Sequence, residues 1–167
     1  MTPMAALLRT FSLVALLLAM PPALATSLAD RFDPARNAAA DVAAAVAQAK
    51  AEGKRVLVDV GGEWCSWCHI MDRFFAADAE ALALRERGYV LVKVNFSPEN
   101  KNEALLARWP RINGYPHLFV LGPDGALVHS QDTSELEAGK GYDRAKMLAF
   151  LRRYSPETAA GRTTASR

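Results

Sequence analysis

Hydrophobic and polar positions follow two different periods along this chain, and the changes of period predict alternating helices and strands. Residues 56–60 form an apolar run interrupted by a single carboxylate, and residues 89–96 form a second apolar run. Runs of this kind are typical of strands that are covered on both faces of a sheet. A third run at 116–121, the turn residues 122–125 and a short run at 126–130 predict an antiparallel hairpin.

Helical periodicity fills the segments around these strands. The expected helices cover residues 35–52, 66–75, 78–87, 97–109 and 142–154. Asp33 and Pro34 suit the N-cap and first position of the first helix, and Gly53 suits its end. After this first helix the order is βαβα followed by ββα. It predicts an α/β protein in which helices flank a central mixed β-sheet.

The N-terminus has the pattern of a signal peptide. Arg9 is the only charged side chain in residues 1–25, and the apolar run at 11–20 is too short to cross a bilayer comfortably. Ala23 and Ala25 are the small residues that signal peptidase accepts before its cut. We therefore predict cleavage after Ala25 and export to the periplasm. An uncleaved N-terminal anchor is the alternative.

The remaining chain has the length of one domain. We assign residues 26–154 to that domain and residues 155–167 to a disordered tail. An apolar content of 51% is sufficient for a hydrophobic core. The formal net charge of +2 gives no electrostatic reason to expect nucleic acid or an anionic membrane as a partner. We expect a monomer.

The two cysteines of the chain, Cys65 and Cys68, lie in the sequence Trp-Cys-Ser-Trp-Cys. A bridge that closes so short a loop removes little entropy from the unfolded chain, which favours a reactive over a stabilising role. The motif follows a predicted strand and begins a predicted helix. A thiolate at a helix N-terminus is stabilised by free N–H groups and the helix dipole, which makes Cys65 the nucleophile. Cys68, one turn further on, is then the resolving thiol.

Asp59 interrupts an otherwise apolar strand just before the cysteine motif. A buried carboxylate beneath the motif would accept the proton of the resolving thiol, directly or through water. Burial would also raise the pKa of this carboxyl group. The alternative is a carboxylate at the strand end that is exposed to water or caps the next helix.

Several separated residues resemble the thioredoxin superfamily, specifically its exported members with a WCxxC motif. The matching residues, in order and with similar spacing, are Val58-Asp59, Glu63-Trp64-Cys65, Cys68, Lys93 and Gly114-Tyr115-Pro116. The resemblance covers about residues 56–127 and is more specific than a lone CxxC. It implies that Asp59 is the buried acid and that Lys93 is its neighbour. It also implies that Pro116 is a cis-proline that faces the disulfide and leaves backbone free for substrate pairing.

The same resemblance suggests a surface for client proteins. We expect Trp64, Trp67, Tyr115 and Pro116 to surround the entry to the cysteine pair and to contact the substrate. Trp67 lies between the two cysteines and is expected to be exposed.

Three positions depart from the thioredoxin pattern. Ser66-Trp67 replaces Gly-Pro between the cysteines, a dipeptide that strongly influences redox potential in that family. Gly61-Gly62 replaces a bulky aromatic residue and an alanine, which predicts a looser floor of the site. Tyr115 stands where a small or β-branched residue is usual.

Two other classes of function fit the cysteines. With His69, the motif is also C-x-x-C-H, the attachment sequence of c-type haem. Against haem attachment, small c-type cytochromes are largely helical, whereas this motif follows a strand. Alternatively, Cys65 and Cys68 with His69 or His117 would supply ligands to Cu(I) or Zn²⁺, but a fourth ligand at a known spacing is missing.

We therefore predict a periplasmic thiol–disulfide oxidoreductase that acts on protein disulfides through Cys65 and Cys68. It requires no metal or cofactor. A buried acid beneath the site resembles the reducing members of the family and favours a reductase or isomerase. In an oxidising compartment such a protein needs an electron donor, for which we expect a membrane-embedded thiol transporter.

Overall fold

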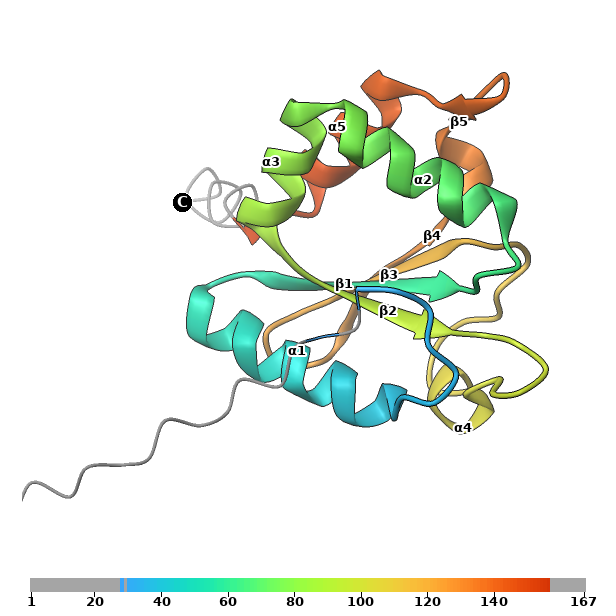
Figure 1. The fold of residues 1–167 in the computed structure, drawn as a ribbon. Coiled ribbons are helices and arrows are strands. Elements are labelled where there is room, and N and C mark those ends of the chain that lie inside the picture. The colour runs from blue at the N-terminus through green and yellow to red at the C-terminus, as the bar shows by residue number, and fades with distance from the viewer. Residues whose placement is uncertain (1–27, 29, 157–167) are drawn as a thin grey trace, which may run out of the picture.

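A computed structural model describes residue 28 and residues 30–156 of the chain (Figure 1). The predicted signal peptide, residues 1–25, lies outside the described residues. So do residues 157–167, which make up most of the predicted tail.

Four strands form the central sheet, in the order β2-β1-β3-β4. The two inner strands are β1 (Arg55–Gly61) and β3 (His117–Leu121), and the two outer ones are β2 (Tyr89–Asn95) and β4 (Leu127–Asp132). β1 is parallel to β2 and antiparallel to β3, which in turn is antiparallel to β4. The predicted mixed sheet is confirmed.

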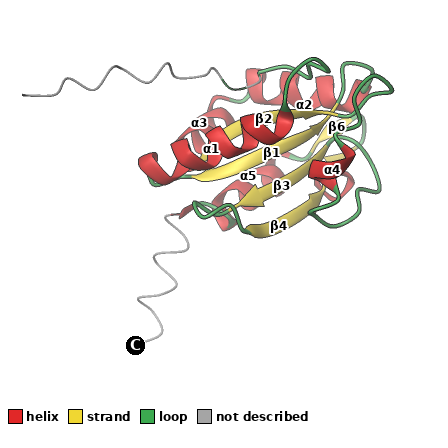
Figure 2. Ribbon diagram, turned by 90° about the horizontal axis from the view of Figure 1, so that it is seen from below, coloured by secondary structure: helices red, strands yellow, loops and turns green. Residues whose placement is uncertain are grey.

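Helices cover both faces of this sheet, as Figures 1 and 2 show from two directions. One face carries α1 (Ala38–Glu52) and the short α4 (Glu103–Leu106). The other face carries α2 (Ser66–Ala77), α3 (Ala79–Gly88) and α5 (Arg144–Arg153). Each face therefore has its own hydrophobic core.

The alternation of side chains along β1 decides which residues meet α2. The valines of β1 belong to the core beneath α1, whereas Leu57 belongs to the core beneath α2 and α5. Because successive side chains of a strand point to opposite faces, Asp59 lies on the same face as Leu57. Gly61, the last residue of β1, is on that face too. This places the unusual carboxylate under the helix that begins at the cysteines.

The first helix starts later than predicted. The Asp33 side chain accepts a hydrogen bond from the N–H of Ala35 at 2.9 Å, which stabilises a turn. The helix begins at Ala38, with Asn37 as the N-cap that accepts from the N–H of Ala40. Gly53 ends it in a left-handed conformation, as predicted.

The predicted helix at 97–109 is mostly wrong, because only four of its residues form α4. Asparagine side chains satisfy the backbone here instead. The Asn95 amide donates to the carbonyl of Asn100 at 2.8 Å, and the Asn102 amide donates to the carbonyl of Asn95 at 2.7 Å. Such local side-chain bonds compete with helix formation. They hold a loop after β2 at the end of the sheet where the cysteines lie.

The segment from Ser130 to Gly141, to which the sequence assigns no role, forms regular secondary structure. It extends β4 and continues as a 3₁₀ turn, η1 (Thr133–Leu136). A small hairpin of β5 (Glu137–Ala138) and β6 (Gly141–Tyr142) follows and packs beside α2. The last helix consequently starts at Arg144, capped by Asp143, two residues after the predicted start.

None of the helices in the described part of the chain is both long enough and apolar enough to cross a membrane.

Candidate active site

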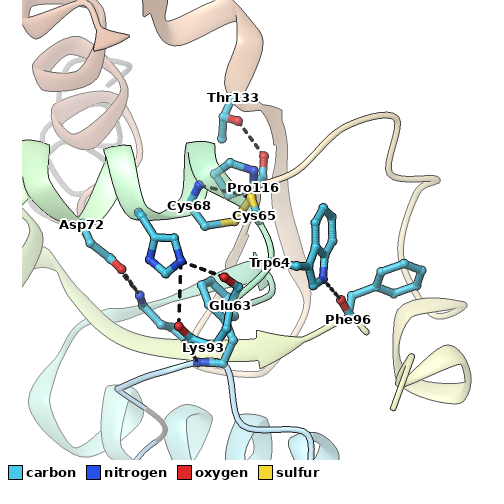
Figure 3. The surroundings of a disulfide bond; sticks show 11 residues. Glu63, Trp64, Cys65, Cys68, Asp72, Lys93, Phe96, Pro116 and Thr133 are labelled. Carbon is cyan, nitrogen blue, oxygen red and sulfur yellow. Dashed lines mark hydrogen bonds and ion pairs between the residues drawn. A yellow bond between two sulfur atoms is a disulfide. The ribbon is translucent and has the colours of Figure 1, made fainter. Parts of the chain in front are cut away.

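Cys65 and Cys68 form a disulfide at the N-terminus of α2, directly after β1 (Figure 3). Cys65 is the N-cap of the helix. Its Sγ accepts the backbone N–H of Cys68 at 3.1 Å. In the reduced protein this N–H and the helix dipole would stabilise a thiolate on Cys65. The predicted position of the motif at a strand-to-helix junction is confirmed.

The two sulfur-bearing residues differ slightly in exposure. Cys65 retains 3% of its surface, and Cys68 retains none. Both are buried in the oxidised protein, so the expected difference between an outer and an inner cysteine is small. Its direction agrees with the expectation that Cys65 is the outer and Cys68 the inner residue of the pair.

Gly61 and Gly62 do not loosen the floor of the site, contrary to expectation. A Cβ on Gly61 would collide with the Sγ of Cys68 and would lie 3.0 Å from the ring of Phe32. A Cβ on Gly62 would collide with the indole of Trp64 and lie 3.0 Å from the carbonyl of Phe96. Neighbouring side chains occupy the space that the glycines vacate. The inner sulfur consequently packs directly against the backbone of β1.

Asp59 lies beneath this contact and is buried, with 3% of its surface exposed. It precedes Gly61 by two residues on the same face of β1, which is a separation of about 7 Å along the strand. Its Oδ1 has no hydrogen-bond partner within the described residues. The alternative of an exposed or capping carboxylate is therefore wrong, and the predicted burial is confirmed.

Burial is the main reason why the pKa of Asp59 is raised to about 7. The negative charge of Asp72 adds to this effect, while the positive charges of Lys93 and Arg85 oppose it. Desolvation therefore outweighs the nearby cations. A carboxyl group with this pKa can both accept and release a proton near neutral pH.

Lys93 lies opposite Asp59 in the pairing of β1 and β2, as the thioredoxin resemblance implies. Its ammonium group, however, binds both carboxylate oxygens of Asp72 in α2, at 2.7 and 2.6 Å. Lys93 is only 6% exposed, and its Nζ lies 4.6 Å from the centre of the Phe32 ring. The lysine thus pairs with a second carboxylate, and within the described residues Asp59 has no direct ionic partner.

Trp64, Tyr115 and Phe96 form one side of the site. The Trp64 indole N–H donates to the carbonyl of Phe96 at 2.7 Å, although 55% of the residue remains exposed. Tyr115 contacts Trp64 edge-on and stacks on Phe96 with ring centres 4.9 Å apart. A mainly apolar groove of about 550 Å³ runs beside Trp64. Its lining includes Phe32, Pro34, Phe96 and Pro98.

Trp67 is half-buried rather than exposed, contrary to expectation. Its ring packs edge-on against Tyr142 in β6, with ring centres 5.6 Å apart. The sequence predicts Tyr142 as the first residue of the last helix, whereas the structure places it in β6. The small hairpin therefore fixes the tryptophan between the cysteines.

Pro116 follows a cis peptide bond after Tyr115, as predicted. Its carbonyl accepts a hydrogen bond from the Thr133 hydroxyl at 2.5 Å. Figure 3 shows Pro116 among the residues that surround the disulfide. Thr133 thus ties the proline to η1.

The two candidate histidine ligands do not converge. The His69 ring lies 2.8 Å from the carbonyl of Glu63. His117 pairs in register with Val60, which places it on the α1 face of the sheet, away from Cys68. Among residues 28 and 30–156, no group of three or more His, Cys, Asp or Glu residues is arranged to hold a metal.

Several residues around the site escape prediction from the sequence. They are Phe32, Asp72, Phe96, Thr133 and Tyr142. Asp72 carries a usable signal, because it lies four residues after Cys68 and therefore one helical turn further along the same face. Phe32 carries none, because its contact with the cysteines depends entirely on the path of the chain before α1.

Residues 37–123 match the model of a protein family described as Thioredoxin-like. The chain is 32% identical to the Thiol:disulfide interchange protein DsbD 2 of Pseudomonas aeruginosa over 91 residues, which are 54% of this chain and 15% of that protein. It is 31% identical to the Thiol:disulfide interchange protein DsbD of Pseudomonas fluorescens over 108 residues, 64% of this chain and 17% of that protein. The chain therefore spans only 15–17% of the length of these relatives.

Solved structures support the fold. The disulphide isomerase of Xylella fastidiosa Temecula1 has a TM-score of 0.63 at 22% identity, covering 73% of this chain and 94% of that chain. The DsbD c-terminal domain of Neisseria meningitidis in the oxidised form has a TM-score of 0.51 at 22% identity, covering 71% of this chain and 96% of that chain.

The contact between Gly61 and Cys68 generates a first prediction. Gly61→Ala should lower the free energy of unfolding of the oxidised protein by about 1–3 kcal/mol, because the new methyl group overpacks the site. Urea unfolding followed by circular dichroism measures the change. Gly114→Ala is the matched control, since nothing lies within 4 Å of a Cβ at that position. Equal effects of the two substitutions would contradict the close approach.

The raised pKa of Asp59 generates a second prediction. The folded protein holds the Asp59 proton more tightly than the unfolded chain, so this group's contribution to stability declines as pH rises from about 4 to about 7. Asp59→Asn removes that penalty. Relative to wild type, the variant should gain up to about 4 kcal/mol of unfolding free energy between these limits and keep the gain above them. Urea unfolding of both oxidised proteins across this pH range measures the difference. Parallel curves would disprove the shift.

Proposed function

This chain belongs to the thioredoxin-like family of thiol–disulfide oxidoreductases, and we propose that it acts in the periplasm on the disulfides of client proteins. One observation carries the proposal. The Cys65–Cys68 disulfide caps the helix that follows β1, and the buried Asp59 lies beneath it on the same strand face as the Cys68 contact. This arrangement supplies a nucleophile, a resolving thiol and a proton acceptor in one place.

In the reducing direction, the Cys65 thiolate attacks one sulfur of a client disulfide. The client S–S bond breaks, a bond forms between Cys65 and the client sulfur, and the other client sulfur leaves as a thiolate. The N-cap position of Cys65 lowers the free energy of the attacking thiolate. Cys65 is the better candidate for this step because it keeps some exposed surface.

The second step depends on Cys68. Its thiol loses a proton and attacks the sulfur of Cys65, which breaks the mixed disulfide, closes the Cys65–Cys68 bond and releases the second client thiolate. Asp59 has a pKa of about 7 and accepts that proton near neutral pH, directly or through water. The two electrons gained by the client come from the two protein thiols.

Clients are proposed to bind across the surface formed by Trp64, Trp67, Tyr115 and Pro116. Trp64 offers a large exposed ring beside an apolar groove, and Tyr115 packs against the cysteine cluster. The ring of Trp67 packs against Tyr142, so Trp67 offers clients less free surface than Trp64 does. Lys93 is proposed to act electrostatically on Asp59 rather than to touch the client.

Export and direction of catalysis rest on sequence arguments. The pattern of residues 1–25 supports a signal peptide cleaved after Ala25 and a periplasmic location. The buried acid supports a reductase or isomerase, and the names of the relatives, thiol:disulfide interchange proteins, agree with exchange chemistry. In that compartment the oxidised pair must be reduced again, for which we propose a membrane thiol donor.

A c-type haem function is less well supported. It would require Cys65 and Cys68 to bind the haem and His69 to bind the iron, usually in a small helical protein. The motif here follows a strand of a four-stranded sheet, and such a function would leave the buried Asp59 without a role.

Separate substitution of the cysteines tests the proposed function. Cys65→Ser should abolish reduction of insulin disulfides, because the thiolate that attacks the client disulfide is removed. Cys68→Ser should instead accumulate mixed disulfides with clients, since the resolving step is lost. Non-reducing electrophoresis with mass spectrometry identifies the trapped species. Trapping by Cys65→Ser and not by Cys68→Ser would reverse the two roles, and an inactive wild-type protein would refute the function.

A further inference from the structure

Phe32 reaches the cysteine pair from outside the part of the chain that carries the family pattern. It precedes α1 and also precedes the residues that match the family model, 37–123. Its side chain is 2% exposed and packs in one buried cluster with Cys65 and Cys68. No other large side chain is a fully buried member of that cluster among the described residues.

The ring of Phe32 occupies a place that β1 cannot fill. It lies 3.0 Å from the point where Gly61 would carry a Cβ, on the same side as the Cys68 sulfur. A residue with a side chain at 61 would collide with that sulfur. An aromatic group can therefore cover this region only if another segment supplies it.

We propose that Phe32 is a positioning residue that closes the inner side of the site, so that Cys68 is shielded and partners react only with Cys65. The proposal rests on the proposed function and adds to it a device for directing exchange. It accounts for the complete burial of Cys68. It also accounts for the burial of Lys93, whose Nζ lies over the Phe32 ring.

Hydrogen bonds hold the segment around Phe32 in place. The backbone N–H of Phe32 donates to the Glu63 carboxylate at 3.1 Å, two residues before the first cysteine. The Asn100 amide donates to the carbonyl of Pro34 at 2.9 Å, which links the segment to the loop after β2. Two hydrogen bonds thus fix the backbone that carries the ring, in addition to the apolar contacts of the ring itself.

Shielding has a chemical consequence for exchange. After Cys65 has formed a mixed disulfide, the Cys68 thiol can either attack Cys65 or react with another molecule that reaches it. A ring that covers Cys68 removes the second possibility and leaves the internal attack, which releases the client. It also keeps water away from the inner sulfur, and a low dielectric disfavours its ionisation until a base accepts the proton.

The experiment uses the fact that the chain has two cysteines, so Cys65→Ser leaves Cys68 as the single thiol. We expect Phe32→Ala in this background to raise the rate of Cys68 alkylation by iodoacetamide by about tenfold or more, because access limits the reaction. Phe32→Leu, which keeps an apolar side chain, should restore most of the protection. The pH profile of the rate should shift to lower pH in the alanine variant, since water then stabilises the thiolate.

Two controls separate shielding from general loosening. In a Cys68→Ser background, Phe32→Ala should raise Cys65 alkylation much less than it raises Cys68 alkylation, because the ring lies beside the inner sulfur. Phe119→Leu alters a buried aromatic residue on the α1 side of the sheet and should leave Cys68 protected. Circular dichroism confirms that each variant is folded.

Unchanged Cys68 alkylation in Phe32→Ala would overturn the proposal, and so would an equal increase in Phe119→Leu. If Phe32→Ala does not fold, Phe32→Leu decides the matter, because its Cys68 rate should still exceed that of the parent. Alkylation does not depend on client turnover. Loss of protection in the single-thiol variant, together with no insulin reduction by the wild-type protein that has both cysteines, would therefore refute the proposed function and leave the shielding role intact.

Discussion

The architecture of the site depends on one steric constraint, the direct approach of the Cys68 sulfur to the backbone of Gly61. Only glycine permits this approach, because a Cβ would overlap the sulfur. It lets α2 begin immediately above the end of β1, with Cys65 as its N-cap. It also sets the inner cysteine above Asp59, the preceding residue on that face of the strand. β1 cannot carry an aromatic side chain at position 61, so Phe32 supplies the aromatic ring that covers the Cys68 sulfur.

Charge distribution around the site follows from this packing. Asp59 sits in an apolar environment with one carboxylate oxygen unpartnered, and desolvation raises its pKa to about 7. Lys93 lies opposite it in the pairing of β1 and β2, yet its ammonium group is engaged by both oxygens of Asp72. A partner bound directly to Asp59 would lower its pKa and make it a weaker base. Because Asp72 rather than Asp59 binds the ammonium group of Lys93, Asp59 keeps a raised pKa and can accept the proton of Cys68.

Much of this site could be predicted from the sequence, because its central parts depend on local patterns. The apolar run around Asp59 and the adjoining cysteine motif are short-range signals. The cis bond before Pro116 is expected from the resemblance to the thioredoxin superfamily. The loop after β2, which asparagine side chains stabilise, is predicted as a helix. Its side-chain hydrogen bonds cannot be recognised from the pattern of apolar and polar residues. Phe32 and Tyr142 reach the site only through the tertiary path of distant segments. The glycine pair suggested free space for the same reason: the residues that fill it are remote in sequence.

Asp59 is proposed to accept the Cys68 proton when the mixed disulfide is resolved. The most direct test of this step is the pH dependence of the rate at which a preformed Cys65 mixed disulfide with a model peptide is released, in wild type and in Asp59→Asn. The asparagine variant should be slower by about tenfold or more near neutral pH, where the thiol needs a base. The two rates should converge at alkaline pH, where the thiol ionises unaided. A ratio that is the same at every pH, or no difference at all, would contradict the role of Asp59.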